Sequence, residues 1–171
     1  MSDILFSARE ANSVLPRIIE WRRALHEAPE VGLDLPETIA FATRALSSLG
    51  ISPREAGRGA FADIGSAGPL VAIRADMDAL PLQEETGAPY ASRIAGRMHA
   101  CGHDAHTAML LGCAALLASS PEPPFRVRLL FQAGEEGCAG ALRLIEAGCL
   151  DGVLAIVGTH VGDLASGLAP G

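Results

Sequence analysis

The residues best suited to chemistry in this chain gather in the stretch MHACGHDAH, residues 98–106. It holds three of the five histidines and one of the four cysteines within nine residues. Imidazole and thiol side chains grouped in a glycine-containing loop often share a proton or bind a metal ion, although single ones are also buried as ordinary core groups. Cys101 and His103 flank Gly102, so both side chains can turn to one side of the loop.

A second candidate is the adjacent acid pair Glu135 and Glu136. Neighbouring carboxylates in a crevice of low dielectric repel each other. The repulsion is relieved if one carboxylate binds a metal ion while the other handles a proton. A pair of acids by itself is also typical of a solvated turn, so its surroundings must decide between the two interpretations.

The apolar pattern predicts the elements that position these residues. Helices are expected at residues 15–26, 36–50, 106–119 and 138–150. Short strands are expected at 51–55 and 60–65, and longer buried strands at 69–77, 125–134 and 152–161. The alternation of long strands with helices predicts an α/β fold with a largely parallel central sheet and helices on both faces.

Polar candidate residues lie where each of the three long strands ends. In chain order they are Asp76 and Asp78, Glu135 and Glu136, and His160. In open parallel sheets this edge binds ligands, because the loops there diverge and leave a crevice. Residues 98–106 lead into the helix between the first two strands and can reach the same crevice. The sequence therefore predicts a site for one or two divalent transition metal ions.

The composition excludes several classes of function. The net charge is −7, and all 13 basic residues are scattered arginines, which argues against a nucleic-acid partner. Without lysine, neither Schiff-base nor P-loop chemistry is available. The N-terminus lacks the pattern of a secretory signal, and the apolar runs are too short to span a bilayer, so we expect a cytoplasmic protein with no membrane partner and with reduced cysteines.

Taken together, the motifs resemble the M20 metallopeptidase family, most closely its aminoacylase-like amidohydrolase branch, which contains hippurate hydrolases and auxin-conjugate hydrolases. The matching stretches follow the family's order and cover nearly the whole chain. They are WRRALHEAPEVGLDLPET, AIRADMDALPLQEETGAPYAS, GRMHACGHDAHTAMLLGCAALLA, LLFQAGEEGCAGALRLIEAGCL and GTHV. The resemblance implies a zinc-exopeptidase-like catalytic domain.

The resemblance also implies roles for individual residues. It implies that the site binds two divalent metal ions, Zn²⁺ or Mn²⁺, and that their protein ligands are Cys101, His103, Glu136 and His160. Glu135 corresponds to the general base, and Asp78 to a carboxylate that orients the site. The implied reaction is hydrolysis of the amide bond in an N-acyl amino acid or related conjugate, in which Glu135 takes a proton from water and returns it to the leaving amine.

The chain departs from the family pattern in two respects. Ala133-Gly134 stand where relatives commonly have Pro-Ala before the acid pair. Family members are also much longer, continuing past GTHV into a lid and dimerisation domain and then a segment with one more histidine ligand. We therefore expect residues 1–171 to be the N-terminal part of a catalytic domain, without the lid or the C-terminal part. The expected protein partner is a second copy of the chain, in a homo-oligomer, or the missing C-terminal half.

Two other interpretations remain open. The chain could be a catalytically inactive remnant or a metal-binding module of the same fold. Alternatively, Cys101 could act as a nucleophile with a nearby histidine as its base, which needs no metal but leaves Glu135, Glu136 and His160 unexplained.

Overall fold

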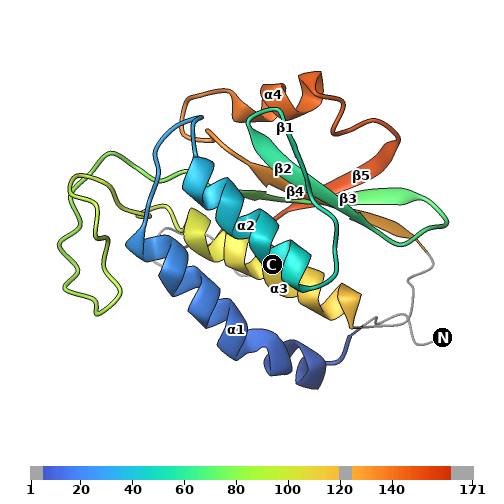
Figure 1. The fold of residues 1–171 in the computed structure, drawn as a ribbon, viewed down its shortest axis with the longest axis horizontal. Helices are drawn as coiled ribbons and strands as arrows, with labels where there is room; N and C mark the ends of the chain where they lie inside the picture. Colours follow the sequence, from blue (N-terminus) through green and yellow to red (C-terminus); the bar gives the residue numbers. More distant parts are fainter. Residues whose placement is uncertain (1–5, 120–124, 163–171) are drawn as a thin grey trace.

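The computed structural model describes residues 6–119 and 125–162. A five-stranded sheet is covered by α1, α2 and α3 on one face and by α4 on the other (Figure 1). The helices are α1 (Ala8–Glu27), α2 (Pro36–Ser48), α3 (His103–Ala118) and α4 (Gly140–Glu146). The strands are β1 (Arg54–Ala56), β2 (Gly59–Ile64), β3 (Leu70–Asp76), β4 (Arg126–Gln132) and β5 (Val153–Gly158). The predicted α/β fold with helices on both faces is confirmed.

The sheet is mixed, with the strand order β1-β2-β4-β3-β5. The three long strands β4, β3 and β5 are parallel, as predicted, whereas β1 and β2 form an antiparallel hairpin at one edge. The hairpin turn is only Gly57 and Arg58, both with positive φ (58° and 68°). A two-residue turn of this kind can join only antiparallel strands. The hairpin extends the parallel part of the sheet because β2 pairs with β4 in an antiparallel arrangement.

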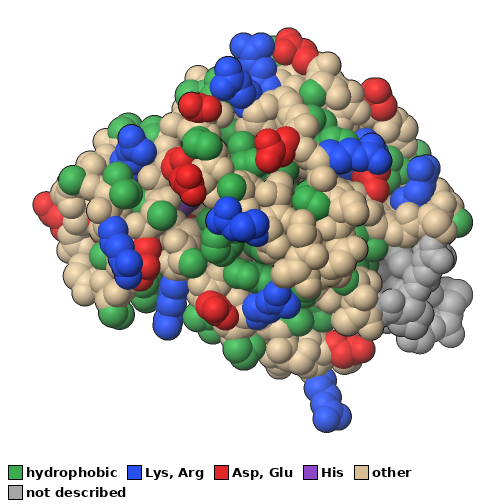
Figure 2. Space-filling view, viewed as in Figure 1, with side chains coloured by type: hydrophobic (Ala, Val, Ile, Leu, Met, Phe, Trp, Pro, Cys, Tyr) green, Lys and Arg blue, Asp and Glu red, His purple; other side chains and the backbone are tan. Residues whose placement is uncertain are grey.

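The surface carries charges of both signs. Figure 2 shows arginine side chains scattered among acidic, polar and apolar groups, with no continuous basic stripe on that face. In the part of the chain that the structure describes, no helix combines the length and apolar character needed to cross a membrane.

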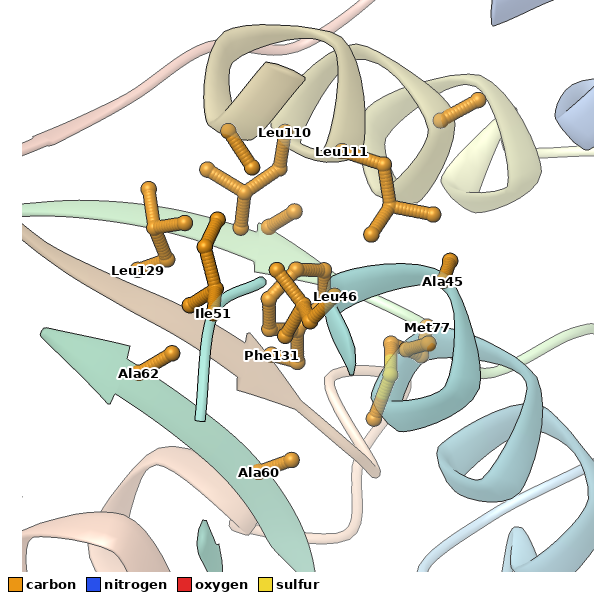
Figure 3. Close-up of a cluster of buried hydrophobic side chains, with 14 of the residues drawn as sticks. Ala45, Leu46, Ile51, Ala60, Ala62, Met77, Leu110, Leu111, Leu129 and Phe131 are labelled. Carbon is orange, nitrogen blue, oxygen red and sulfur yellow. The ribbon is translucent and has the colours of Figure 1, made fainter. Parts of the chain in front are cut away.

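The main core lies between the sheet and the three helices on its first face. Leu46, Leu111, Leu129 and Phe131 are fully buried there and converge from α2, α3 and β4 (Figure 3). The helix α3 is apolar nearly all round because the sheet covers one side of it and α1 covers another. At the crossing with α1, a Cβ added to Gly112 would lie 2.4 Å from Ile18 Cδ1, so glycine permits the close approach.

The start of α3 is three residues earlier than predicted, at His103 rather than His106. Gly102 precedes it with φ = 89°, and its carbonyl accepts hydrogen bonds from the backbone N–H groups of Ala105 and His106. Positive φ is strongly unfavourable for residues with a Cβ, so Gly102 sets where the loop turns into the helix. As a result, His103 stands in the first turn of a buried helix instead of in a loop.

Candidate metal centre

The predicted convergence at the carboxyl edge of the sheet is present in the structure. Asp76 is the last residue of β3, and Glu135 and Glu136 follow β4 by three and four residues. His160 lies two residues beyond the end of β5, and His103 begins α3. Because β3, β4 and β5 are parallel neighbours, their ends meet at one edge.

Three overlapping groups of side chains lie there, and within each group one ligand atom per residue lies within 4.8 Å of the others. The groups are Cys101, His103 and His160; His103, Glu135 and Glu136; and Asp76, His103 and His106. Within them, Cys101 Sγ lies 3.4 Å from His160 Nε2, and His103 Nε2 lies 3.8 Å from Glu135 Oε2. All five residues that the sequence analysis singled out as ligands or base are therefore in one cluster, with His103 at its centre.

The orientation of His103 leaves one nitrogen free for a ligand. Its Nδ1–H donates to the backbone oxygen of Asp78 at 2.7 Å, so in the neutral ring Nε2 is the acceptor. That Nε2 is buried and has no hydrogen-bond partner among the described residues. Burial disfavours the charged imidazolium, but Asp78 and Asp76 outweigh it and raise the pKa of His103. A buried, unpaired acceptor nitrogen beside carboxylates fits a divalent cation.

The role of Asp78 is to fix the loop that carries the acid pair. Its carboxylate accepts the backbone N–H groups of Glu135 at 2.8 Å and Glu136 at 3.0 Å. Together with its carbonyl contact to His103, the residue joins β3, the β4 loop and α3. These contacts are of the orienting kind that the resemblance implied for Asp78.

Replacing Asp78 with Asn is expected to lower the free energy of unfolding of the metal-free polypeptide by about 1–3 kcal/mol at pH 7. The amide can accept from one of the two backbone N–H groups, and its own NH₂ faces the other. Burial raises the pKa of Asp78, but the neighbouring His103 ring and the hydrogen bonds from the backbone N–H groups of Glu135 and Glu136 outweigh it and lower the pKa below the ordinary 3.8.

That stabilisation is present above pH 3.8 and is lost as the pH falls through the lowered pKa. The difference between Asp78→Asn and the wild type should therefore shrink in acid, as measured by urea unfolding. The matched control is Asp34→Asn, which removes an exposed ion pair with Arg58 and should change little. Equal stability of the Asp78 variant and the wild type at pH 7 would contradict this role.

Asp76 and His106 form a buried pair next to His103. His106 Nδ1 lies 2.6 Å from Asp76 Oδ1, and His106 Nε2 accepts the backbone N–H of Val161 at 2.9 Å. Both ring nitrogens of His106 are thus engaged. The hydrogen bond to Nε2 fixes the backbone of Val161, the residue that follows His160. His106 was not predicted as a site residue, although its spacing of three residues from His103 places both on one face of α3.

Another buried polar network lies behind the cluster and was not predicted. His26 Nδ1 lies 2.7 Å from Asp104 Oδ2, and His26 Nε2 lies 3.2 Å from Glu84 Oε1. Arg22 Nε also contacts Asp104 Oδ2, at 2.7 Å. The network ties α1 to the start of α3 and to the segment that follows β3. Its only sequence signal was the spacing of Arg22 and His26, four residues apart on one helix face.

The Cys101 thiol is protonated at neutral pH when no ion is bound, because burial and the Glu136 carboxylate raise its pKa to about 11. Binding of a metal ion by this thiol would therefore release the proton. The metal affinity is expected to rise about tenfold per pH unit from this group alone. Chelator competition at several pH values measures the slope.

The Cys101→Ala variant should lose about one unit of that slope. The matched control is Cys138→Ala, whose thiol donates to the backbone oxygen of Glu136 at 3.6 Å and should leave the slope unchanged. A slope that is the same in Cys101→Ala and the wild type would exclude this thiol from the metal site.

The fold and the clustered donors together define an α/β protein of the metallopeptidase type. Residues 72–169 match peptidase family M20/M25/M40, and this match covers more than half of the chain. The chain belongs to that family.

Two curated relatives show what share of a longer protein this chain corresponds to. The chain is 47% identical to the N-acetyl-L-cysteine deacetylase of Bacillus subtilis, over 93% of this chain and 41% of that protein. It is 48% identical to the IAA-amino acid hydrolase ILR1-like 5 of Arabidopsis thaliana, over 84% of this chain and 34% of that protein. The chain thus spans at most about two fifths of these relatives.

Solved structures agree with the fold. A dinuclear metal-binding peptidase of the M20 family from Bacillus subtilis superposes with a TM-score of 0.84 at 43% identity, covering 88% of this chain and 44% of that chain. A glutaminyl cyclase from Porphyromonas gingivalis superposes with a TM-score of 0.56 at 19% identity, covering 90% of this chain and 60% of that chain, which shows the shared fold alone.

Proposed function

We propose that the chain supplies the metal-binding part of a hydrolase that cleaves the amide bond of N-acyl amino acids or related conjugates. The observation that carries the proposal is the buried, unpaired Nε2 of His103, which faces a thiol, an imidazole and two carboxylates. The names of the relatives, a deacetylase of N-acetyl-L-cysteine and a hydrolase of IAA-amino acids, support the substrate class.

The ligands in this proposal are Cys101, His103, Glu136 and His160, which hold two divalent ions. The likeness to a dinuclear M20 peptidase supports the number of ions. Thiolate and imidazole suit Zn²⁺, and the carboxylate is compatible with Mn²⁺. When bound, such ions polarise a carbonyl oxygen and lower the pKa of bound water.

Glu135 is the proposed general base. Its side chain is 42% exposed, so it can meet both water and a bound substrate, while Asp78 holds its backbone in place. Its carboxylate takes a proton from the attacking water as the new carbon–oxygen bond forms. It then gives that proton to the amine as the carbon–nitrogen bond breaks. No covalent intermediate with the protein is required.

The domain organisation is also a proposal. Residues 1–171 correspond to the N-terminal part of the catalytic domain, and the lid and the C-terminal part come from a further segment or a partner chain. The share of each relative that the chain covers supports this assignment. We further propose a cytoplasmic location, because a ligand thiol must stay reduced, and a small-molecule substrate instead of nucleic acid.

The test is metal content together with turnover. The double variant Cys101→Ala and His103→Ala is expected to lose at least one metal ion per chain, measured by elemental analysis after mild chelation and metal re-addition. It should also lose hydrolysis of N-acetyl-L-cysteine in an active polypeptide that carries this chain. The control is Cys113→Ala, a free thiol within α3 and outside the cluster.

Unchanged stoichiometry in the double variant would refute the ligand set. Full metal content without turnover in an otherwise complete polypeptide would show a metal-binding module. Turnover that resists chelators but requires Cys101 would instead support a cysteine nucleophile.

A further inference from the structure

We propose that the cavity beside Cys101 is the subsite for the acyl half of the substrate, and that His99 is the hydrogen-bonding group that selects an uncharged acyl group there. The inference rests on the proposed amide hydrolysis and adds to it the position and chemistry of one half of the substrate.

The cavity has a volume of about 480 Å³, and Cys101, one member of the metal cluster, is among its lining residues. One wall is formed by Cys101 and Gly102, and the others by α1 and the segment that follows β3. Side chains that can contact a ligand in it include Arg22, Glu84, Tyr90 and His99. The volume is in the range of small-molecule sites, and the position allows a group bound there to place its neighbouring carbonyl at the cluster.

His99 is the polar group of the cavity that lacks a partner. Its residue is only 4% exposed, and neither ring nitrogen has a hydrogen-bond partner among the described residues. A buried imidazole without hydrogen bonds lowers the stability of the fold. An unpaired imidazole in the wall of a cavity therefore points to a ligand that supplies the missing hydrogen bonds. The contrast with His26 in the same wall is informative, because both of that residue's nitrogens are engaged. A neutral imidazole offers one donor and one acceptor, which match an amide or a carbonyl.

The charges around the cavity disfavour a carboxylate. Arg22 is the arginine in its wall, and its Nε is already paired with Asp104 at 2.7 Å. Glu84 is a second buried carboxylate in contact with His26. Arg22 and His26 are thus each already in contact with a buried carboxylate. In an N-acyl amino acid the amino-acid half carries the carboxylate, so the uncharged acyl half suits this cavity better.

The remaining wall is apolar and suits a carbon skeleton. Ala88, Met98 and Val161 contribute aliphatic surface, and the Tyr90 ring lies 5.0 Å from the Arg22 guanidinium. This packing holds Tyr90 against a charged group while its ring still lines the cavity. We therefore expect an acyl group larger than acetyl to be accommodated.

The experiment uses the two halves of the substrate as separate probes. In the Zn²⁺-loaded polypeptide carrying this chain, histidine ring signals are followed by NMR during titration with acetamide, benzamide or glycine. The His99 signal is assigned by its absence in His99→Gln. Saturable shifts of His99 with benzamide, and none with glycine, are expected.

Two variants test the hydrogen bond. His99→Leu should weaken benzamide binding about fivefold, the effect of one hydrogen bond, whereas His99→Gln keeps a donor and an acceptor and should stay within about twofold of the wild type. The control Ile94→Ala changes an exposed side chain outside the cavity and should have no effect. Because the wild-type signal is itself a readout, a His99→Leu variant that fails to fold leaves the test intact.

The outcomes separate this inference from the proposed function. Stronger shifts of His99 with glycine than with benzamide, or no shift with either amide, would overturn the acyl subsite even if N-acyl amino acids are hydrolysed. Shifts with benzamide, combined with no hydrolysis by a complete metal-loaded polypeptide, would refute the proposed reaction and leave the binding subsite.

Discussion

Glu135→Gln in the proposed hydrolase is expected to retain the bound metal ions and to lower kcat for N-acyl amino acids by about 10²–10⁴-fold, the usual range for a lost general acid-base group. The amide has the size of the carboxylate but cannot take a proton from water. The backbone N–H of residue 135 can still donate to Asp78, so the loop should keep its position. The measurement is steady-state turnover in an active polypeptide carrying this chain, with metal content determined on the same sample.

The neighbouring variant Glu136→Gln should behave in the opposite way. It is expected to weaken metal binding, because a neutral amide oxygen is a poorer ligand than a carboxylate for either ion. Excess metal should restore part of its activity and none of the activity of Glu135→Gln. Glu146→Gln serves as the control, because it changes only an exposed ion pair with Arg143 on α4. If the two variants exchange behaviours, the assignment of the acid pair is reversed.

The site residues whose position could be predicted from the sequence are those at the ends of the parallel strands. Each long strand was visible as a short apolar run, and the polar residue after it had to lie at the carboxyl edge once β3, β4 and β5 were parallel. This geometry brought Glu135, Glu136 and His160 together without any knowledge of side-chain contacts. The residue spacing around Gly102 did the same for Cys101 and His103.

The buried polar pairs could not be predicted, because the sequence states residue types but not distant partners. His26 contacts Asp104 across 78 positions of the chain and Glu84 across 58. Each of these residues has an ordinary explanation as a helix-end or loop residue. Only the packing of α1 against α3 makes them a network. His99 was left unassigned for the same reason, since its lack of partners is a property of the folded cavity.

The antiparallel hairpin was missed for a local reason. Its strands were expected, but the turn residues Gly57 and Arg58 give a weak signal, because arginine rarely adopts positive φ. A second glycine or an asparagine at that position would have been typical of this hairpin turn.

The 171-residue polypeptide produced alone is expected to self-associate and to hydrolyse N-acyl amino acids very slowly or not at all. Among the described residues β5 pairs only with β3, and Leu154, Ile156 and Val157 are 76%, 51% and 57% exposed. Apolar side chains on an unpaired strand edge promote association between chains. The four proposed ligands are also few for two ions, since a catalytic zinc ion usually has about three protein ligands of its own.

A chimera tests this expectation directly. Fusing residues 1–171 to the C-terminal part of the Bacillus subtilis N-acetyl-L-cysteine deacetylase, to which the chain is 47% identical, should cover β5 and complete the ligand set. We expect the chimera to be less associated in analytical ultracentrifugation, to bind metal more tightly and to gain turnover. The control is the same chimera with Glu135→Gln, which should assemble and bind metal but remain inactive. Robust metal-dependent turnover by the purified 171-residue polypeptide would instead mean that a second copy completes the site.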